Sequence, residues 1–171
     1  MTQQFNEIFS NQDLLLLQDK LIQNSQTITT AESCTGGLIA SYITSNSGSS
    51  AIFRGSIVTY CNEIKEQELK VSKTTMIEYG VVSKEVVSQM LKGVIAKFDA
   101  DFAIAVSGVA GPTGGTKAKP VGTVVIGIMN KNGVQDIEVF HLKGDRNEVQ
   151  IQASKISLKK IAKFIDLPLD K

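Results

Sequence analysis

The chain has 171 residues, of which 42% are hydrophobic, and this length and composition suit a single globular domain with a sizeable core. Its 18 basic and 17 acidic residues leave a formal net charge of +1, which excludes a global electrostatic attraction to nucleic acid or to an anionic membrane. Aromatic residues make up only 6% of the chain and include no Trp, so it lacks obvious stacking platforms for single-stranded nucleic acid.

The N-terminal part shows no targeting pattern. No basic segment precedes an apolar stretch, and the apolar run at residues 14–17 is too short for a secretory core or a membrane span. We therefore expect a cytoplasmic protein without a membrane partner, with one domain over residues 1–171 and a loose N-terminal extension over residues 1–12. In a reducing compartment, Cys34 and Cys61 are expected to be free thiols.

The first half of the chain predicts a helix, a strand, a second helix and a second strand. Apolar residues between positions 14 and 22 recur on one side of a helix, and residues 26–31 are typical of a strand. The segment Thr29-Thr30-Ala31-Glu32-Ser33-Cys34-Thr35-Gly36-Gly37 leads into the second helix, and residues 52–60 form the second strand. Ser33 is thereby placed at a strand-to-helix turn, where free helix N–H groups attract anions.

The second half predicts one long helix, three strands and a final helix. Residues 84–98 carry a continuous apolar stripe at helical spacing, and residues 100–106 read as a strand buried on both faces. Residues 121–129 and 134–142 form a hairpin across Asn132-Gly133, and the last helix begins at Asp145. Its inward residues are expected to be Val149, Ala153, Ile156, Ile161 and Phe164. The sum is an α/β fold, a three-layer α/β/α sandwich with a mixed, mostly parallel sheet.

Ser33 is a candidate nucleophile that needs a base. The only histidine, His141, lies far along the chain in a predicted strand, so Lys65 is the plausible base if burial lowers its pKa. Tyr60 ends a strand, and a polar turn leads from it to Lys65, so Tyr60 is placed to relay a proton or orient the lysine. The alternatives are that Ser33 or Thr35 only caps the helix and that Lys65 is a solvated surface residue.

Three further features have both a functional and a structural interpretation. Cys34 is a rival nucleophile, although a small buried residue behind the turn is the favoured interpretation. The loop at residues 108–116 resembles neither a P-loop nor a dinucleotide fingerprint, yet its glycines allow several N–H groups to face one phosphate. Lys119 and Arg146 are candidate cations for a phosphate or carboxylate, or solvated charges. No cluster has metal-ligand spacing, so no metal is expected.

Three blocks together carry a family resemblance. They are residues 29–37, Gly55-Ser56-Ile57-Val58-Thr59-Tyr60-Cys61-Asn62-Glu63-Ile64-Lys65 and residues 107–123, and Gly144-Asp145-Arg146 follows them. From about residue 14 to the last helix, the chain resembles the CinA C-terminal domain family, which includes stand-alone bacterial nicotinamide-nucleotide amidases. The family's proposed catalytic serine, tyrosine and lysine match Ser33, Tyr60 and Lys65. The chain departs from the family pattern at three positions, namely Cys61, Ser107 and Thr113.

The resemblance implies an amidohydrolase that converts nicotinamide mononucleotide and water to nicotinate mononucleotide and ammonia through a Ser33 acyl-enzyme, without a cofactor. The expected partners are this small nucleotide and further copies of the chain. Two alternatives stay open: a nucleotide-binding or interaction module without turnover, linked to competence or DNA-damage responses, and an amidase for another small nucleotide-like amide. The expected oxyanion-stabilising and substrate-binding residues are Glu32, Thr35, Gly36, Gly37, Asn62, Ser107, Gly111, Gly114, Gly115, Thr116 and Arg146.

Overall fold

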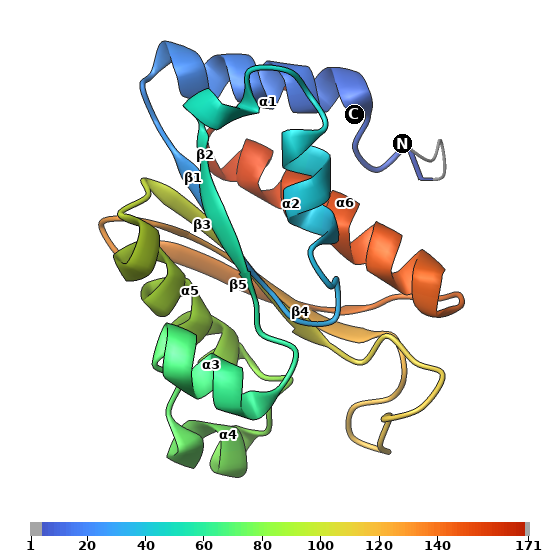
Figure 1. Ribbon diagram of the computed structural model, residues 1–171. Coiled ribbons are helices and arrows are strands. Elements are labelled where there is room, and N and C mark those ends of the chain that lie inside the picture. Colours follow the sequence, from blue (N-terminus) through green and yellow to red (C-terminus); the bar gives the residue numbers. More distant parts are fainter. Residues whose placement is uncertain (1–4, 170–171) are drawn as a thin grey trace.

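A computed structural model of the chain describes residues 5–169, and its centre is a five-stranded sheet in the order β2-β1-β3-β4-β5 (Figure 1). The strands are β1 (Ile28–Glu32), β2 (Phe53–Val58), β3 (Phe102–Gly108), β4 (Thr123–Asn130) and β5 (Gln135–His141). β1 pairs in parallel with β2 and β3, whereas β4 is antiparallel to both β3 and β5. Only β4 therefore runs against the other strands, which confirms the predicted mixed, mostly parallel sheet.

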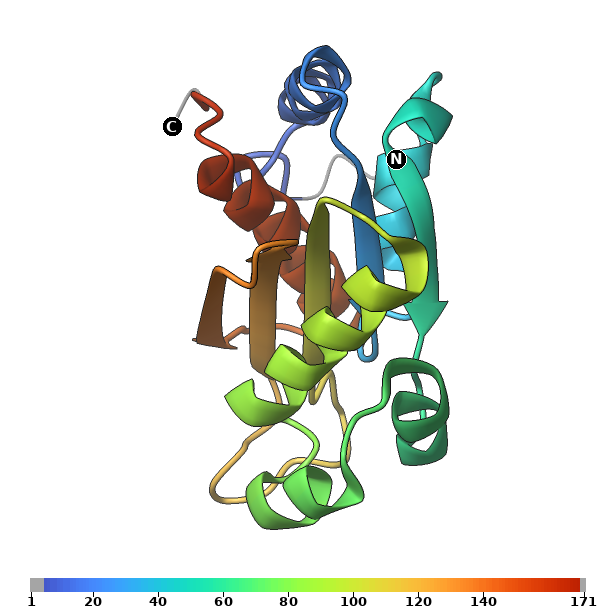
Figure 2. The same cartoon turned by 90° about the vertical axis from the view of Figure 1, so that its left-hand side faces the viewer.

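Helices cover both faces of this sheet. On one face lie α1 (Asn11–Gln23), α2 (Leu38–Thr44) and α6 (Arg146–Phe164), and the short 3-10 helix η1 (Ser49–Ala51) follows α2. On the other face α5 (Lys84–Phe98) crosses the strands, and α3 (Asn62–Leu69) and α4 (Lys73–Tyr79) pack beside it. Figure 2 shows α5 and α6 on opposite sides of the sheet, so the three-layer α/β/α prediction is confirmed.

The three interior strands, β1, β3 and β4, are buried because each face of the sheet contributes to a separate core. Along β3, Ile104 and Val106 join the core beneath α1, α2 and α6, whereas Ala103 and Ala105 join the core beneath α5. Successive side chains of a strand point to opposite faces, so a strand covered on both sides becomes a continuous apolar run. This burial explains the uninterrupted hydrophobic stretch that predicts β3.

The predicted helices over the strongest apolar patterns are confirmed. α5 has the predicted bounds, and the Ser83 hydroxyl accepts a hydrogen bond from the Val86 N–H at its start. α6 begins at Arg146, one residue after the predicted start, and Asp145 is its N-cap. Among the predicted inward residues of α6, three are buried, namely Val149, Ala153 and Ile161. The other two, Ile156 and Phe164, are partly buried against the same core. No helix among residues 5–169 is both long and apolar enough to cross a membrane.

Two expectations need correction. The polar turn expected before Lys65 is helix α3, in which only Lys65 and Leu69 are buried, so its inward face shows no ordinary apolar pattern. The loose extension expected over residues 1–12 is packed at its end, because Phe9 is 2% exposed and α1 begins at Asn11 behind a Ser10 capping box. Residues 1–4 of that extension lie outside the described residues.

Candidate active site

Ser33 lies at the C-terminal edge of the sheet, directly after strand β1, which lies between β2 and β3. The parallel strands β1, β2 and β3 end at this edge, so the segments that follow them converge there. The Ser33 N–H donates to the Val106 carbonyl at 3.1 Å, and the Thr59 N–H donates to the Glu32 carbonyl at 2.7 Å. These backbone bonds hold the serine between the ends of β2 and β3.

Lys65 reaches Ser33 from helix α3 and is almost fully buried, with 3% of its surface exposed. Its Nζ lies 3.3 Å from the Ser33 Oγ and donates to the Thr59 carbonyl at 2.8 Å. Burial lowers the pKa of Lys65 below its ordinary value, and nearby Cys61, Cys34 and Glu63 oppose this shift only in part. A lysine with a lowered pKa, hydrogen-bonded to a serine hydroxyl, is suited to act as a general base.

A cavity of about 220 Å³ contains this pair, and Asn62, Tyr60 and Ser107 also line it. A larger cavity of about 600 Å³ lies next to it, with Pro112, Val121, Asn147 and Gln150 in its walls. The two cavities share Ala110 and Arg146, which makes the whole site elongated. Such a shape can hold the reacting group of a ligand beside Ser33 while the rest of the ligand extends past Arg146.

Tyr60 and Arg146 form a pair at the mouth of the smaller cavity. Tyr60 is 60% exposed, and its hydroxyl accepts a hydrogen bond from Arg146 Nη2, while Arg146 Nη1 donates to the Gly111 carbonyl at 2.8 Å. Among residues 5–169, Tyr60 makes no hydrogen bond to Ser33 or Lys65. The structure thus joins Ser33 to Lys65 and Tyr60 to Arg146, rather than joining all three predicted catalytic residues.

Glu32 was expected among the substrate-binding residues, and its surroundings correct this expectation. Its side chain is fully buried and accepts hydrogen bonds from the N–H groups of Gly37, Ile39 and Ala40 at 2.8 to 3.1 Å. It also accepts a bond from the Thr35 hydroxyl at 2.7 Å. The carboxylate therefore occupies the N-terminus of α2 from inside the protein and stabilises the turn that carries Ser33.

Hydrogen bonds within the turn leave fewer N–H groups for the predicted oxyanion hole. The Gly36 N–H donates to the Ser33 carbonyl at 3.1 Å and the Gly37 N–H to Glu32, so neither group is available to a substrate. Both glycines have positive φ angles of 62° and 97°, which explains why the turn uses glycine there. The Thr35 N–H, in contrast, has no hydrogen-bond acceptor among residues 5–169.

The glycine-rich loop contributes less to the site than the sequence predicts. Ser107 lines the smaller cavity and donates its hydroxyl hydrogen to the Val81 carbonyl, while Gly111 supplies the carbonyl that Arg146 binds. Gly114, Gly115 and Thr116 line neither of the two cavities. Thr116 instead closes a turn with Lys119, whose Nζ donates to the Tyr79 carbonyl at 2.7 Å. The structure therefore gives no phosphate cradle at residues 114–116.

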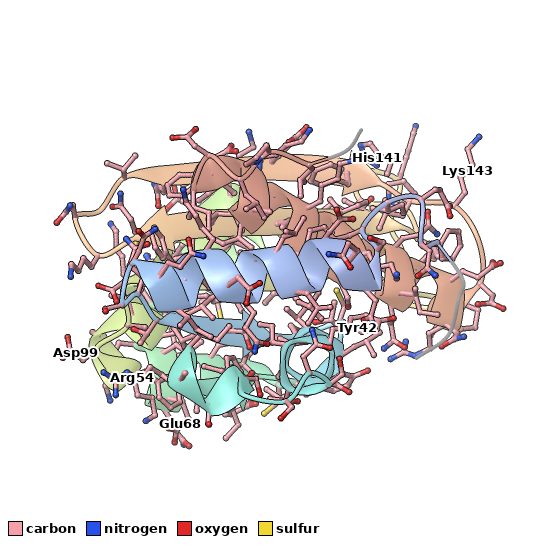
Figure 3. The ribbon with its side chains drawn as sticks, turned by 90° about the horizontal axis from the view of Figure 1, so that it is seen from above. Tyr42, Arg54, Glu68, Asp99, His141 and Lys143 are labelled. Atoms are coloured by element: carbon pink, nitrogen blue, oxygen red, sulfur yellow. The ribbon has the colours of Figure 1, made fainter. Side chains whose placement is uncertain are left out.

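Cys34 and His141 are unsuited to the chemistry at Ser33. Burial raises the pKa of the Cys34 thiol to about 12, so it stays protonated at neutral pH, in agreement with the favoured structural interpretation. His141 lies on β5, which β3 and β4 separate from β1, and Figure 3 shows it opposite Arg54 of β2, at the other edge of the sheet. Among residues 5–169 no group of acidic, histidine and cysteine side chains is arranged to hold a metal ion.

Sequence reasoning missed several residues of the site. Val81, Val82 and Ala110 line the smaller cavity, and their apolar character gives no signal beyond packing. Gln150 of α6 was also missed, although its Nε2 donates to the Cys34 carbonyl at 2.7 Å, on the turn that carries Ser33. Its position four residues after Arg146 places both side chains on one face of α6, which is the available sequence signal.

Known proteins resemble this chain over most of its length. A "Putative competence-damage inducible protein" of Caldicellulosiruptor saccharolyticus is 45% identical over 147 residues, covering 86% of this chain and 36% of the relative. A "CinA-like protein" of Fervidobacterium nodosum is 42% identical over 142 residues, covering 83% of this chain and 35% of the relative. The chain thus spans about a third of the length of these relatives.

Solved structures agree with the fold. The competence/damage inducible protein CihA from Agrobacterium tumefaciens matches with a TM-score of 0.89 and 32% identity, covering 97% of this chain and 99% of that one. The competence damage-inducible protein A (ComA) from Klebsiella pneumoniae matches with a TM-score of 0.88 and 31% identity, covering 91% and 96%. The family model described as the CinA C-terminal domain matches residues 12–165. This chain therefore belongs to the CinA C-terminal domain family.

Proposed function

We propose that this protein is an amidohydrolase that removes ammonia from the carboxamide of nicotinamide mononucleotide. The observation that carries the proposal is the buried Lys65, whose Nζ lies 3.3 Å from the Ser33 hydroxyl inside a cavity. A binding module has no need of a desolvated lysine beside a serine, because burying a lysine costs stability. The family resemblance and the elongated site with its arginine support the choice of substrate.

The proposed reaction has two steps. The Ser33 Oγ attacks the carboxamide carbon while neutral Lys65 accepts the hydroxyl proton, and the resulting ammonium returns that proton to the departing nitrogen, which leaves as ammonia. Water then attacks the Ser33 ester and gives a proton to Lys65, which passes it to the departing Ser33 Oγ. The product acid releases its remaining proton to solvent and leaves as a carboxylate. Lys65 makes a hydrogen bond to the Thr59 carbonyl, which holds its Nζ beside the serine through both steps.

The rest of the substrate is assigned to the larger cavity. With the carboxamide at Ser33, the ribose phosphate extends past Arg146, whose guanidinium meets the phosphate charge. Tyr60 and the Gly111 carbonyl hold this guanidinium between the two cavities. Tyr60 then acts by positioning Arg146 at the entrance, and Asn62 remains a wall residue of the carboxamide cavity.

The test is ammonia release from nicotinamide mononucleotide, run beside free nicotinamide and the dinucleotide, with Ser33→Ala as the inactive control. Release from the mononucleotide that disappears in Ser33→Ala supports the proposal. Ser33→Ala removes one partly exposed hydroxyl and should leave the folded state intact. Binding of the mononucleotide without turnover would instead favour the nucleotide-binding module, and turnover of a different amide alone would replace the substrate.

A further inference from the structure

The turn after Ser33 is held on one side by Gln150 of helix α6. Gln150 Nε2 donates to the Cys34 carbonyl at 2.7 Å, and a Cβ added at Gly36 would lie 3.9 Å from the same nitrogen. The amide therefore packs directly against the turn, although α6 is separated from it by more than a hundred residues of sequence. This contact fixes the plane of the peptide that joins Cys34 to Thr35.

The orientation of that peptide determines where the Thr35 N–H points. A trans peptide directs its C=O and its N–H in opposite directions, and the only cis peptide among residues 5–169 is Gly111-Pro112. Because the Cys34 carbonyl faces α6, the Thr35 N–H faces away from α6. Lys65 approaches Ser33 from α3, which lies on the opposite face of the sheet from α6 (Figures 1 and 2). The N–H is thus directed toward the side of the turn from which Lys65 reaches Ser33.

The Thr35 N–H also remains available, as does the Cys34 N–H, because neither group has an acceptor among the described residues. The Gly36 and Gly37 N–H groups are bonded to the Ser33 carbonyl and to Glu32, whereas Thr35 N–H has no acceptor among the described residues. A hydrogen bond to the carbonyl of a peptide polarises the N–H of the same peptide and makes it a stronger donor. Gln150 therefore acts on both the direction and the strength of the Thr35 N–H.

We infer that Gln150 is a positioning residue, which turns the Cys34-Thr35 peptide so that the Thr35 N–H stabilises the oxyanion formed when Ser33 attacks a carbonyl. This inference rests on the proposed function for the role of Ser33 as nucleophile. Of the three residues from Thr35 to Gly37 whose N–H groups the sequence predicts for the oxyanion hole, it keeps only Thr35. It also gives Glu32 and Gln150 complementary tasks, since Glu32 binds the turn from the end of β1 and Gln150 binds it from α6.

The experiment compares wild type with Gln150→Met, which keeps the side-chain length and removes the donor. Gln150→Lys keeps a donor at this position, and Gln152→Met is the matched control, because Gln152 bonds to Lys143 and Glu148 away from the site. The readouts are ammonia release from nicotinamide mononucleotide and release of nitrophenolate from p-nitrophenyl acetate, which needs Ser33 and an oxyanion donor but no nucleotide site. Rates are expressed per folded molecule, with the folded fraction taken from urea unfolding.

Loss of one oxyanion donor lowers kcat by about 100- to 1,000-fold in a hydrolase, so a donor that is only misdirected should cost at least about tenfold. We expect Gln150→Met to lower both rates by that factor with KM for the mononucleotide within about twofold, and Gln150→Lys to recover most of the rate. Wild-type rates in Gln150→Met overturn the inference. Serine-dependent ester cleavage without mononucleotide turnover overturns only the substrate assignment, and no serine-dependent cleavage of either compound overturns both proposals.

Discussion

Lys65 combines a stability cost with a chemical use. Its ammonium form is buried, and both of its hydrogen-bond partners, the Ser33 hydroxyl and the Thr59 carbonyl, are uncharged. Burial without a carboxylate partner disfavours the charged form, and this lowers the pKa of Lys65. The burial of Lys65 therefore suits catalysis rather than stability, because the serine hydroxyl needs a neutral amine as its proton acceptor.

The lowered pKa of Lys65 predicts the pH dependence of activity. As pH falls through this pKa, Lys65 becomes an ammonium and cannot accept the serine proton, so kcat/KM should fall and should recover as pH rises through it. The midpoint should lie below the ordinary lysine value of 10.5. The measurement is kcat/KM for ammonia release across pH 6 to 10 (about the range in which lysine bases operate). A Lys65→Arg variant, which stays charged, should be inactive throughout; activity in that variant would contradict the role.

The lowered pKa of Lys65 also predicts how the unfolding free energy changes with pH. The folded pKa of Lys65 lies below the unfolded value, so between the two values the unfolded state binds more protons and the unfolding free energy rises with pH. Below that window the burial cost is fully present. The unfolding free energy of Lys65→Met should therefore rise less with pH between these two pKa values. The variant should also be at least as stable as wild type at neutral pH, as measured by urea unfolding. A large loss of stability in Lys65→Met would show that the ammonium contributes to the fold.

Glu32 should stabilise the protein as well as shape the site. Glu32→Gln keeps one acceptor oxygen and places an NH₂ group against N–H and O–H donors that the carboxylate satisfied, namely those of Thr35, Gly37, Ile39 and Ala40. Each buried unsatisfied group costs about 1–3 kcal/mol, so we expect a loss of about 3 kcal/mol in urea unfolding. The control Glu66→Gln breaks only an exposed ion pair with Lys73 and should cost less than about 1 kcal/mol. Equal costs would refute the capping role.

Elements with a clear apolar pattern were predictable from sequence, and the site was predictable only in part. α5 and β3 follow their patterns because whole faces of them are buried. Helix α3 was not predicted because its buried residues are one lysine and one leucine, which give no apolar pattern. Glu32 and Gln150 are ordinary polar residues whose roles depend on a backbone turn brought to them by folding. The sequence therefore indicates Ser33 and Lys65, whereas the groups that orient them need coordinates.

Helix α6 supports the site through two side chains one turn apart. Gln150 bonds to the Cys34 carbonyl, and Arg146 reaches Tyr60 and the Gly111 carbonyl. One helix on the α1 and α2 face therefore contacts the segments that follow β1, β2 and β3. A substitution on α6 should change the site without changing the strands that carry Ser33.

Arg146→Met tests the substrate-binding side of α6. If the guanidinium meets the phosphate, its loss removes a charge-assisted hydrogen bond, and KM for the mononucleotide should rise by about tenfold or more. Ester cleavage by Ser33 should change much less, because p-nitrophenyl acetate carries no phosphate. Arg54→Met is the control, since Arg54 lies on the edge strand β2, apart from the residues lining the two cavities. An unchanged KM in Arg146→Met would remove this arginine from substrate binding.

At the scale of the whole molecule, a second buried lysine joins parts that are distant in sequence. Lys155 of α6 is 2% exposed, and its Nζ donates to the Phe9 carbonyl and to Asn6 Oδ1, both at 2.8 Å. The same Nζ lies 5.7 Å from the centre of the ring of Tyr42, a residue of α2. Burial lowers the pKa of Lys155, as it does for Lys65, but Lys155 lines neither cavity of the candidate site. The residue thus ties the N-terminal segment and α2 to α6.

Lys155→Ala should destabilise the protein while leaving its chemistry intact. The substitution leaves the Phe9 carbonyl without its donor and removes the packed lysine stem, so we expect a loss of about 2 kcal/mol in urea unfolding. Ammonia release per folded molecule should stay within about twofold of wild type, because residues acting on stability alone leave the rate of folded molecules unchanged. Lys163→Ala, an exposed change on the same helix, should cost less than about 1 kcal/mol. If Lys155→Ala matched Lys163→Ala in stability, the buried ammonium would be a tolerated charge, and the apolar contacts of Phe9 alone would hold the N-terminal segment against α6.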